Sequence, residues 1–180
     1  MKDYEIDGDL VEFVITAPFG ISKKLVYKLK SRTTLGVLIE LIAGSRNNLI
    51  IASPFIQINY ERKERVIYEA LEIAIKRGVK VDIFTTGEST DLFSENPIFR
   101  EYKNVKCFRS KQDLVGRSRL GSHAKFCISD DKKAYIGSAN LTWPGLYENL
   151  EMGILVQGSL AIKVREFWET IFEEGIIEEF

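Results

Sequence analysis

The chain has 180 residues, of which 45% are hydrophobic and 28% charged, and its formal net charge is −1. This length and apolar content suit one domain with a substantial core and argue against disorder, while the near-zero net charge argues against a uniformly basic nucleic-acid binder. Two cysteines and a single histidine exclude a disulfide framework and leave little from which to build a zinc site.

The N-terminal third predicts a strand, a helix and a buried strand. Val11–Thr16 is the first strand, and Ala17–Gly20 has the composition of a turn or loop. Thr34 is expected to cap a helix that ends at Gly44, and the apolar run Asn48–Phe55 predicts a buried, parallel strand. The apolar face of this helix is predicted to comprise Leu35, Leu38, Ile39 and Ile42.

The middle of the chain continues this alternation of strands and helices. Val66–Ile75 has helical periodicity and is followed by Gly78, after which Val79–Ile83 begins another strand, so a βαβ unit is predicted. Asn104–Arg109 is an extended segment, and Ser110–Ser122 lacks periodicity and predicts a loop. Cys107 and Cys127 both fall in strand-like runs, where buried free thiols are expected.

The C-terminal third predicts two motif strands, a connection over Leu141–Tyr147, a strand over Glu148–Val156 and a last helix capped by Ser159. In the connection, Trp143 either stacks on a base or packs at the rim, and packing is the commoner role of an aromatic side chain. The strand is predicted to bury Leu150, Met152, Ile154 and Val156. The helix is predicted to bury Leu160, Val164, Phe167, Trp168, Ile171 and Phe172.

The stretch Gly121–Gly153 contains the residue types of a phosphoryl-transfer site. His123 and Lys125 lie two apart, so in an extended segment they share a face opposite Ala124 and Phe126. An imidazole can attack phosphorus or carry a proton near neutral pH, and a neighbouring ammonium can hold phosphate oxygens.

Three further residues extend this pattern. Ser138 and Asn140, also two apart, add neutral donors for the same oxygens. Asp130 is either part of the site or a turn residue, because Asp131 follows it directly where the strand ends. Glu151 alternates with the predicted core face of its strand, so its carboxylate can reach His123 and fix the tautomer of the imidazole.

The spacing of these residues resembles the HxKxxxxDxxxxxxGSxN signature of the phospholipase D superfamily, and every signature position is present. The resemblance implies an α/β fold, a phospholipase D-like α-β-α sandwich with a mixed central sheet. It also implies phosphodiesterase chemistry without a metal ion or another cofactor, in which one histidine forms a covalent phosphohistidine and a second protonates the leaving oxygen.

His123 is the only histidine in the chain. A family mechanism with two histidines therefore requires a homodimer, in which a two-fold axis brings His123 of each subunit into one shared site. In this respect the chain resembles the small single-motif bacterial endonucleases of the superfamily. These enzymes carry a glutamate eleven residues after the motif asparagine, and Glu151 occupies that position here.

The charges are unevenly distributed along the chain. Arg100–Lys125 holds eight Lys or Arg against two acids, and Ser22–Arg32 holds five against none. The first block leads into the motif, and within it Arg117 and Arg119 either clamp a polyanionic substrate or are plain exposed charges. For Ser22–Arg32, a substrate contact and plain solvated surface are equally good interpretations.

We therefore expect residues 1–180 to form one phospholipase D-like domain with one motif at 123–140, acting as a nuclease on nucleic acid, with DNA favoured. The alternatives are a phospholipid hydrolase or transferase and a non-catalytic nucleic-acid-binding subunit of a larger defence complex. The segment VITAPFG followed by a helix and NLIIASPF is loosely similar to the phospholipase D-like component of bacterial DISARM antiphage systems. No signal segment or membrane span is apparent, so a cytoplasmic protein without a membrane partner is expected.

Overall fold

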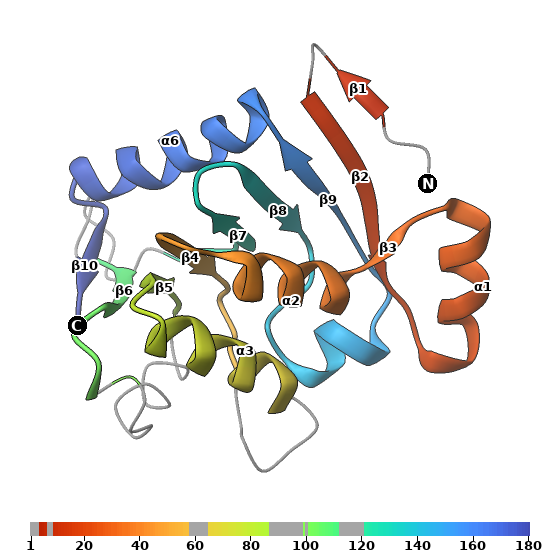
Figure 1. The fold of residues 1–180 in the computed structure, drawn as a ribbon, viewed down its shortest axis with the longest axis horizontal. Coiled ribbons are helices and arrows are strands. Elements are labelled where there is room, and N and C mark those ends of the chain that lie inside the picture. Colours follow the sequence, from red (N-terminus) through yellow and green to blue (C-terminus); the bar gives the residue numbers. More distant parts are fainter. Residues whose placement is uncertain (1–3, 7–8, 58–64, 87–98, 100, 112–120) are drawn as a thin grey trace.

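The structure is a computed structural model that describes residues 4–6, 9–57, 65–86, 99, 101–111 and 121–180. Figure 1 shows how its elements are arranged. The elements are β1 (Tyr4–Ile6), β2 (Asp9–Thr16), α1 (Phe19–Leu29), β3 (Arg32–Thr33), α2 (Thr34–Gly44), β4 (Asn48–Ala52), α3 (Arg65–Lys76), β5 (Lys80–Phe84), β6 (Val105–Ser110), β7 (Phe126–Ser129), β8 (Lys133–Gly137), the π-helical turn η2 (Pro144–Glu148), β9 (Glu151–Gln157), α6 (Ser159–Glu173) and β10 (Ile177–Glu179).

The described strands form one mixed sheet in the order β1-β2-β9-β8-β7-β4-β5-β6-β10, with β3 beside β2. β4, β5 and β6 are parallel to one another, as the predicted βαβ unit requires, whereas β2, β9, β8, β7 and β4 are joined by antiparallel pairs. In an antiparallel pair the start of one strand lies beside the end of the next. In this half of the sheet, segments that are distant in the sequence therefore lie at the same end of adjacent strands.

Helices cover both faces of the sheet. On one face α2 and α3 pack against residues such as Leu49, Ile83 and Leu155, and on the other α6 packs through Trp168 against Phe84 and Phe108. Figure 1 shows α6 on the opposite side of the strands from α2 and α3. The predicted α-β-α sandwich with a mixed sheet is confirmed.

The helix starts differ from the predictions in three places. The predicted turn at Ala17–Gly20 is wrong, because α1 begins at Phe19, where the Pro18 carbonyl accepts the amides of residues 21 and 22. The cap of α2 is Thr33, whose hydroxyl accepts the Gly36 amide, rather than Thr34, which is buried inside the helix. The third difference lies at α6.

The N-terminus of α6 is capped from a distant strand. Both carboxylate oxygens of Asp9, on β2, accept hydrogen bonds from the amides of Ser159 and Leu160, at 2.5 and 2.9 Å. The Ser159 hydroxyl also donates to Asp9, at 2.8 Å, so the predicted cap is itself a donor to the capping residue. A carboxylate at this position complements the partial positive charge of the helix end.

The burial of apolar residues departs from the predicted faces in β9 and α6. Leu150 and Met152, predicted as core, are 75% and 61% exposed. Phe167 and Phe172 of α6 are about half exposed, and only part of the predicted stripe, such as Trp168, is buried. Both cysteines are free and buried, as predicted, and burial raises the pKa of each thiol to about 12.

Candidate functional site

The motif residues other than Asp130 lie at one end of five adjacent strands, β2, β9, β8, β7 and β4. Across this end Thr16 pairs with Glu151, Gly137 pairs with Gly153, and Ala52 pairs with Phe126, the residue after Lys125. The segment that carries His123 and Lys125 enters β7 from this end, and Ser138 leaves β8 at the same end. The antiparallel pairing thus brings together residues that are far apart in the sequence.

Lys125 is buried, whereas His123 is exposed. The Lys125 ammonium donates to the His123 carbonyl oxygen at 2.9 Å, and the Lys125 carbonyl accepts the Gly137 amide at 3.1 Å. Burial lowers the pKa of Lys125, and the carboxylate of Glu151 opposes that shift. A buried cation near an exposed imidazole can hold an anionic group against that imidazole.

Ser138 and Glu151 form the second part of the site. The Ser138 hydroxyl donates to one carboxylate oxygen of Glu151 at 2.5 Å and accepts the Met152 amide at 3.1 Å. The other oxygen of Glu151 accepts the side-chain amide of Asn149 at 3.0 Å. The hydrogen bonds of Glu151 therefore go to Ser138 and Asn149 in this structure, rather than to His123 as the sequence suggested. Asn149 was missed because its spacing from Glu151 matches no motif.

Asn140 lies beside Ser53, which is far from it in sequence. The buried hydroxyl of Ser53, directly after β4, lies 3.5 Å from the Asn140 side-chain oxygen and accepts the Leu141 amide at 3.1 Å. A Cβ at Gly145 in η2 would lie 2.3 Å from the Asn140 carbonyl oxygen, so only glycine lets η2 pack this closely. The sequence did not predict Ser53 as a neighbour of Asn140, because Ser53 lies in a segment far from the motif.

Position 137 requires glycine because a side chain there would collide with Tyr135. The ring of Tyr135 lies over Gly137 and over its partner Gly153 on β9. A Cβ at Gly137 would meet the Tyr135 hydroxyl oxygen at 2.2 Å, and one at Gly153 would meet the same ring at 2.7 Å. Burial raises the pKa of Tyr135 to about 12. The glycine of the GSxN pattern therefore makes room for an aromatic ring beneath the site.

Asp130 lies at the opposite end of β7 from Lys125. Its carboxylate accepts the backbone amides of Arg46, Asn47 and Asn48 at 2.7, 2.7 and 2.9 Å, and its φ is +50°. Burial alone would raise the pKa of Asp130, but these three hydrogen bonds prevail and lower it. Of the two interpretations of Asp130, these contacts favour the turn residue, which fixes the start of β4.

Arg117 and Arg119, the predicted substrate clamps, lie outside the described residues. Trp143 packs at the rim, as expected for an aromatic side chain, since its ring stacks on Tyr147 with 3.9 Å between the centroids. Its indole nitrogen also donates to Glu148 at 2.7 Å. Trp143 and Tyr147 form one wall of a groove of about 570 Å³, and β2 and α1 form another.

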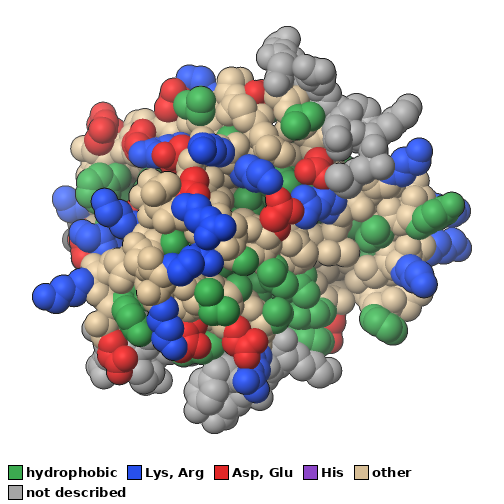
Figure 2. Space-filling model, in the orientation of Figure 1, with side chains coloured by type: hydrophobic (Ala, Val, Ile, Leu, Met, Phe, Trp, Pro, Cys, Tyr) green, Lys and Arg blue, Asp and Glu red, His purple; other side chains and the backbone are tan. Residues whose placement is uncertain are grey.

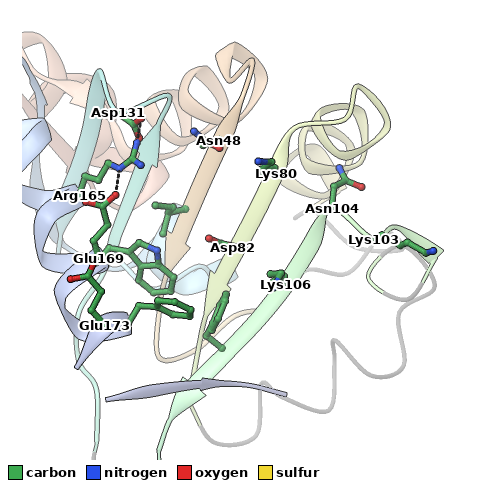
Figure 3. A pocket seen from close by; sticks show the side chains of 14 residues that line it. Asn48, Lys80, Asp82, Lys103, Asn104, Lys106, Asp131, Arg165, Glu169 and Glu173 are labelled. Atoms are coloured by element: carbon green, nitrogen blue, oxygen red, sulfur yellow. Dashed lines mark hydrogen bonds and ion pairs between the residues drawn. The ribbon is translucent and has the colours of Figure 1, made fainter. Parts of the chain in front are cut away.

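A larger cavity, of about 680 Å³, lies between α6 and the strands β4 to β6, away from the motif. Figure 3 shows lysines on its strand side and acidic residues on α6. Several of its charges are already paired, because Arg165 binds Asp131 and Glu169 while Lys106 binds Glu179. No histidine lines it, and none of the motif residues does, so its size alone does not make it the candidate site.

Among the described residues, no group of His, Cys, Asp and Glu side chains is arranged to hold a metal ion. In the same part of the chain, none of the helices combines the length and the apolar character needed to cross a bilayer.

Comparison with known proteins adds sequence and fold relationships. The family described as "Cardiolipin synthase, PLD-like domain" matches residues 38–174 of this chain. The DISARM protein DrmC of Bacillus paralicheniformis is 32% identical over 159 residues, which are 86% of this chain and 60% of the relative. The virion nicking-joining enzyme of Monkeypox virus is 25% identical over 175 residues, 94% of this chain but 39% of that protein. The chain thus spans less than two thirds of the length of these curated relatives.

A solved structure shares the fold at low sequence identity. NucT from Helicobacter pylori superposes with a TM-score of 0.66 and 18% identity, over 94% of this chain and 99% of that one. At this identity the likeness concerns the fold alone.

Proposed function

Since the chain belongs to the phospholipase D-like family, we propose that it is a metal-independent phosphodiesterase that cleaves nucleic acid at a site shared by two subunits. The observation that carries this proposal is that the exposed His123, the buried Lys125 ammonium and the Ser138–Glu151 pair all lie at one end of the sheet. The Gly137 amide donates a backbone hydrogen bond to the Lys125 carbonyl, which joins the segment of Ser138 to that of Lys125.

In the proposed reaction, a ring nitrogen of His123 forms a bond to phosphorus as the bond to the leaving oxygen breaks. The partner subunit's His123 gives its proton to that oxygen. Lys125, Ser138 and Asn140 hold the non-bridging oxygens, whose charge grows in the transition state. Water then attacks the phosphorus, the bond from phosphorus to the His123 nitrogen breaks, and the proton of the water passes to the partner's His123, which restores both rings.

Glu151 acts in this proposal through Ser138 and Lys125. Its carboxylate accepts the Ser138 hydroxyl and raises the pKa of Lys125 against the effect of burial. The first effect orients the hydroxyl and the second favours the charged form of the ammonium before substrate arrives. Asp130 has no part in this chemistry, and its role is to hold the turn before β4.

The dimer follows from the single histidine and gains support from an exposed apolar surface beside the site. We call this surface, formed by Ile136, Leu150, Met152 and Phe167, the apolar rim. These side chains are 37%, 75%, 61% and 49% exposed. Met152 follows Glu151 directly, and Phe167 packs edge-on against Phe126, the cross-strand partner of Ile136. Burying these side chains against a second copy would bring two sites together about a two-fold axis.

Nucleic acid is favoured over phospholipid as the substrate. The motif resembles that of single-motif endonucleases, which favours nucleic acid. The chain is also similar to a nicking-joining enzyme and to a DISARM protein, and both similarities favour it. The family description names a cardiolipin synthase, so a lipid substrate is the second candidate. A third is a nucleic-acid-binding subunit without catalysis.

One set of assays separates these three functions. Purified protein in EDTA is given single-stranded DNA, duplex DNA, RNA, phospholipid vesicles and bis(p-nitrophenyl) phosphate, beside His123→Ala. We expect the wild type to hydrolyse the aryl diester and a nucleic acid, and the variant to lose both activities. Equal residual activity in the two proteins would reject His123 as nucleophile, and activity on vesicles alone would favour the lipid enzyme. Retained binding of intact oligonucleotide would favour the binding subunit.

A further inference from the structure

α1 has no buried residue, although it is eleven residues long. Phe19 and Tyr27 are 96% and 85% exposed, and its lysines are exposed as well. A helix of this length gains little stability by itself in water, so packing normally has to support it. Figure 1 shows α1 standing out from the sheet beside the turn η2. Its outer surface therefore packs against no other element that the structure describes, and we expect a binding partner to cover it.

The exposed side chains of α1 form two rows. Residues four apart lie one above the other on a helix, so Phe19, Lys23 and Tyr27 make one row and Lys24 and Lys28 lie in the next. Figure 2 shows lysine and hydrophobic side chains side by side at this end of the molecule. One row thus alternates aromatic rings with a cation, and the other is purely cationic.

The charged side chains of α1 are all positive, and they form no ion pair with the residues that the structure describes. α1 has no acidic residue, and Lys30 follows its end. Neither Lys23, Lys24, Lys28 nor Lys30 forms an ion pair with any other residue that the structure describes. A concentration of unpaired cations attracts a polyanion.

The groove between α1 and η2 connects this surface with the candidate site. It is lined by Thr16, whose strand partner is Glu151, and it extends to Phe19 and Ser22 of α1. The stacked rings of Trp143 and Tyr147 form its other wall. A flexible polymer bound at the motif can therefore leave past Glu151, run along an aromatic wall and reach the lysine rows.

We propose that α1 and this groove bind a single strand of nucleic acid that enters or leaves the candidate site, with bases stacking on Phe19 and Tyr27 and phosphates held by Lys23, Lys24 and Lys28. This proposal rests on the proposed function and deepens it by naming the substrate as single-stranded. Aromatic faces interleaved with cations are the pattern that binds unpaired bases, and paired bases cannot offer those faces.

Two other occupants fit the surface less well. A helix that lies on a bilayer separates its apolar and charged faces, whereas here Lys23 stands between Phe19 and Tyr27 in one row. A second copy could offer the acidic segment 166–180, but four of its six acids are already paired, in Lys163–Glu166, Arg165–Glu169, Arg109–Glu178 and Lys106–Glu179.

The test measures binding by fluorescence anisotropy, with a labelled 20-nucleotide oligothymidylate and its duplex counterpart, in a His123→Ala background that prevents turnover. The variant Lys23→Ala/Lys24→Ala/Lys28→Ala removes three charges of α1. Its control, Lys80→Ala/Lys103→Ala/Lys163→Ala, removes three exposed charges elsewhere. Circular dichroism and thermal unfolding show that each variant is folded.

We expect the α1 lysine variant to weaken binding of the single strand by about tenfold or more and to reduce the slope of log Kd against log salt by about 2, as three lost phosphate contacts predict. Phe19→Ala/Tyr27→Ala should weaken single-strand binding by about tenfold or more with an unchanged salt slope, and duplex binding by less than about twofold. The control should stay within about twofold of the parent.

Equal losses in the α1 lysine variant and its control would overturn the proposal, as would aromatic variants that bind the single strand like the parent. Wild-type binding to vesicles of phosphatidylglycerol that depends on α1, with oligonucleotide binding retained in the α1 variants, would assign the helix to a membrane instead. Because binding is measured without turnover, a wild type that binds through α1 but hydrolyses no diester would overturn the proposed enzyme and leave this inference standing.

Discussion

Ser138 and Glu151 face each other across the ends of β8 and β9, with 2.5 Å between the serine hydroxyl and a carboxylate oxygen. They are thirteen positions apart in sequence, and η2 lies within that interval. The pair links the GSxN segment to the strand that lines the apolar rim. It therefore joins the proposed chemistry to the proposed dimer interface.

Glu151→Gln tests the electrostatic role of this pair. The amide can still accept the Ser138 hydroxyl, but its lost charge no longer raises the pKa of Lys125. Lys125 should then lose its proton at lower pH, so we expect the alkaline limb of the profile of kcat/KM against pH to move to lower pH. We also expect kcat to fall by about tenfold or more. Glu174→Gln, on the exposed end of α6, is the matched control, and an identical alkaline limb in all three proteins would contradict this role.

Leu150→Glu/Met152→Glu tests the shared site. Placing two carboxylates in the apolar rim should prevent association, because charge at the centre of an interface is costly to desolvate. Light scattering should give the mass of one chain, and diester hydrolysis should fall with it. Ile73→Glu changes another exposed apolar residue, on α3, and should leave the dimer intact. A wild type that is monomeric and fully active would refute the two-histidine site.

Asp130→Ala tests the turn residue and its pH dependence. Loss of three hydrogen bonds to a carboxylate should lower the free energy of unfolding by about 1 to 3 kcal/mol. The pKa of Asp130 is lowered in the folded protein, so its stabilisation is complete above the unfolded value of about 4 and is lost as pH falls through the folded value.

Urea unfolding from pH 7 down to pH 2 measures this dependence. The wild type should lose stability over the acidic end of the range, and the variant should lose less of it there. Asp130→Asn tolerates the same positive φ and keeps one acceptor, so it should lie between the two. Unchanged stability at pH 7 in Asp130→Ala would argue against the turn role.

Gly137→Ala tests the space beneath the site. The new methyl group would meet the Tyr135 ring, so we expect a loss of about 1 to 3 kcal/mol in thermal unfolding. Tyr135→Phe removes the nearest atom and should recover part of the loss in the double variant. Gly44→Ala, where nothing lies within 4 Å, should be neutral or slightly stabilising. An unchanged melting temperature in Gly137→Ala would show that the ring moves aside freely.

The resemblance of the motif implied the sandwich, whereas hydrophobic periodicity predicted individual strands and helices. The run at β4 and the helical pattern at α3 carry that signal within themselves, and both elements form. The prediction failed where burial depends on which element covers a face. Leu150 and Met152 alternate like core residues, yet α6 leaves them uncovered. Asp9 caps α6 from 150 residues away, a distance over which no local pattern can act.

The sequence by itself determined which residues we propose to react, because the spacing of His123, Lys125, Ser138 and Asn140 lies within one short stretch of chain. Only the tertiary structure decided which neighbours surround them. Antiparallel pairing brings Ser53 to Asn140 and Glu151 to Ser138, while the length of β7 separates Asp130 from Lys125. The reason is physical: spacing along a strand fixes the face of each side chain, but partners across the sheet depend on strand order and register.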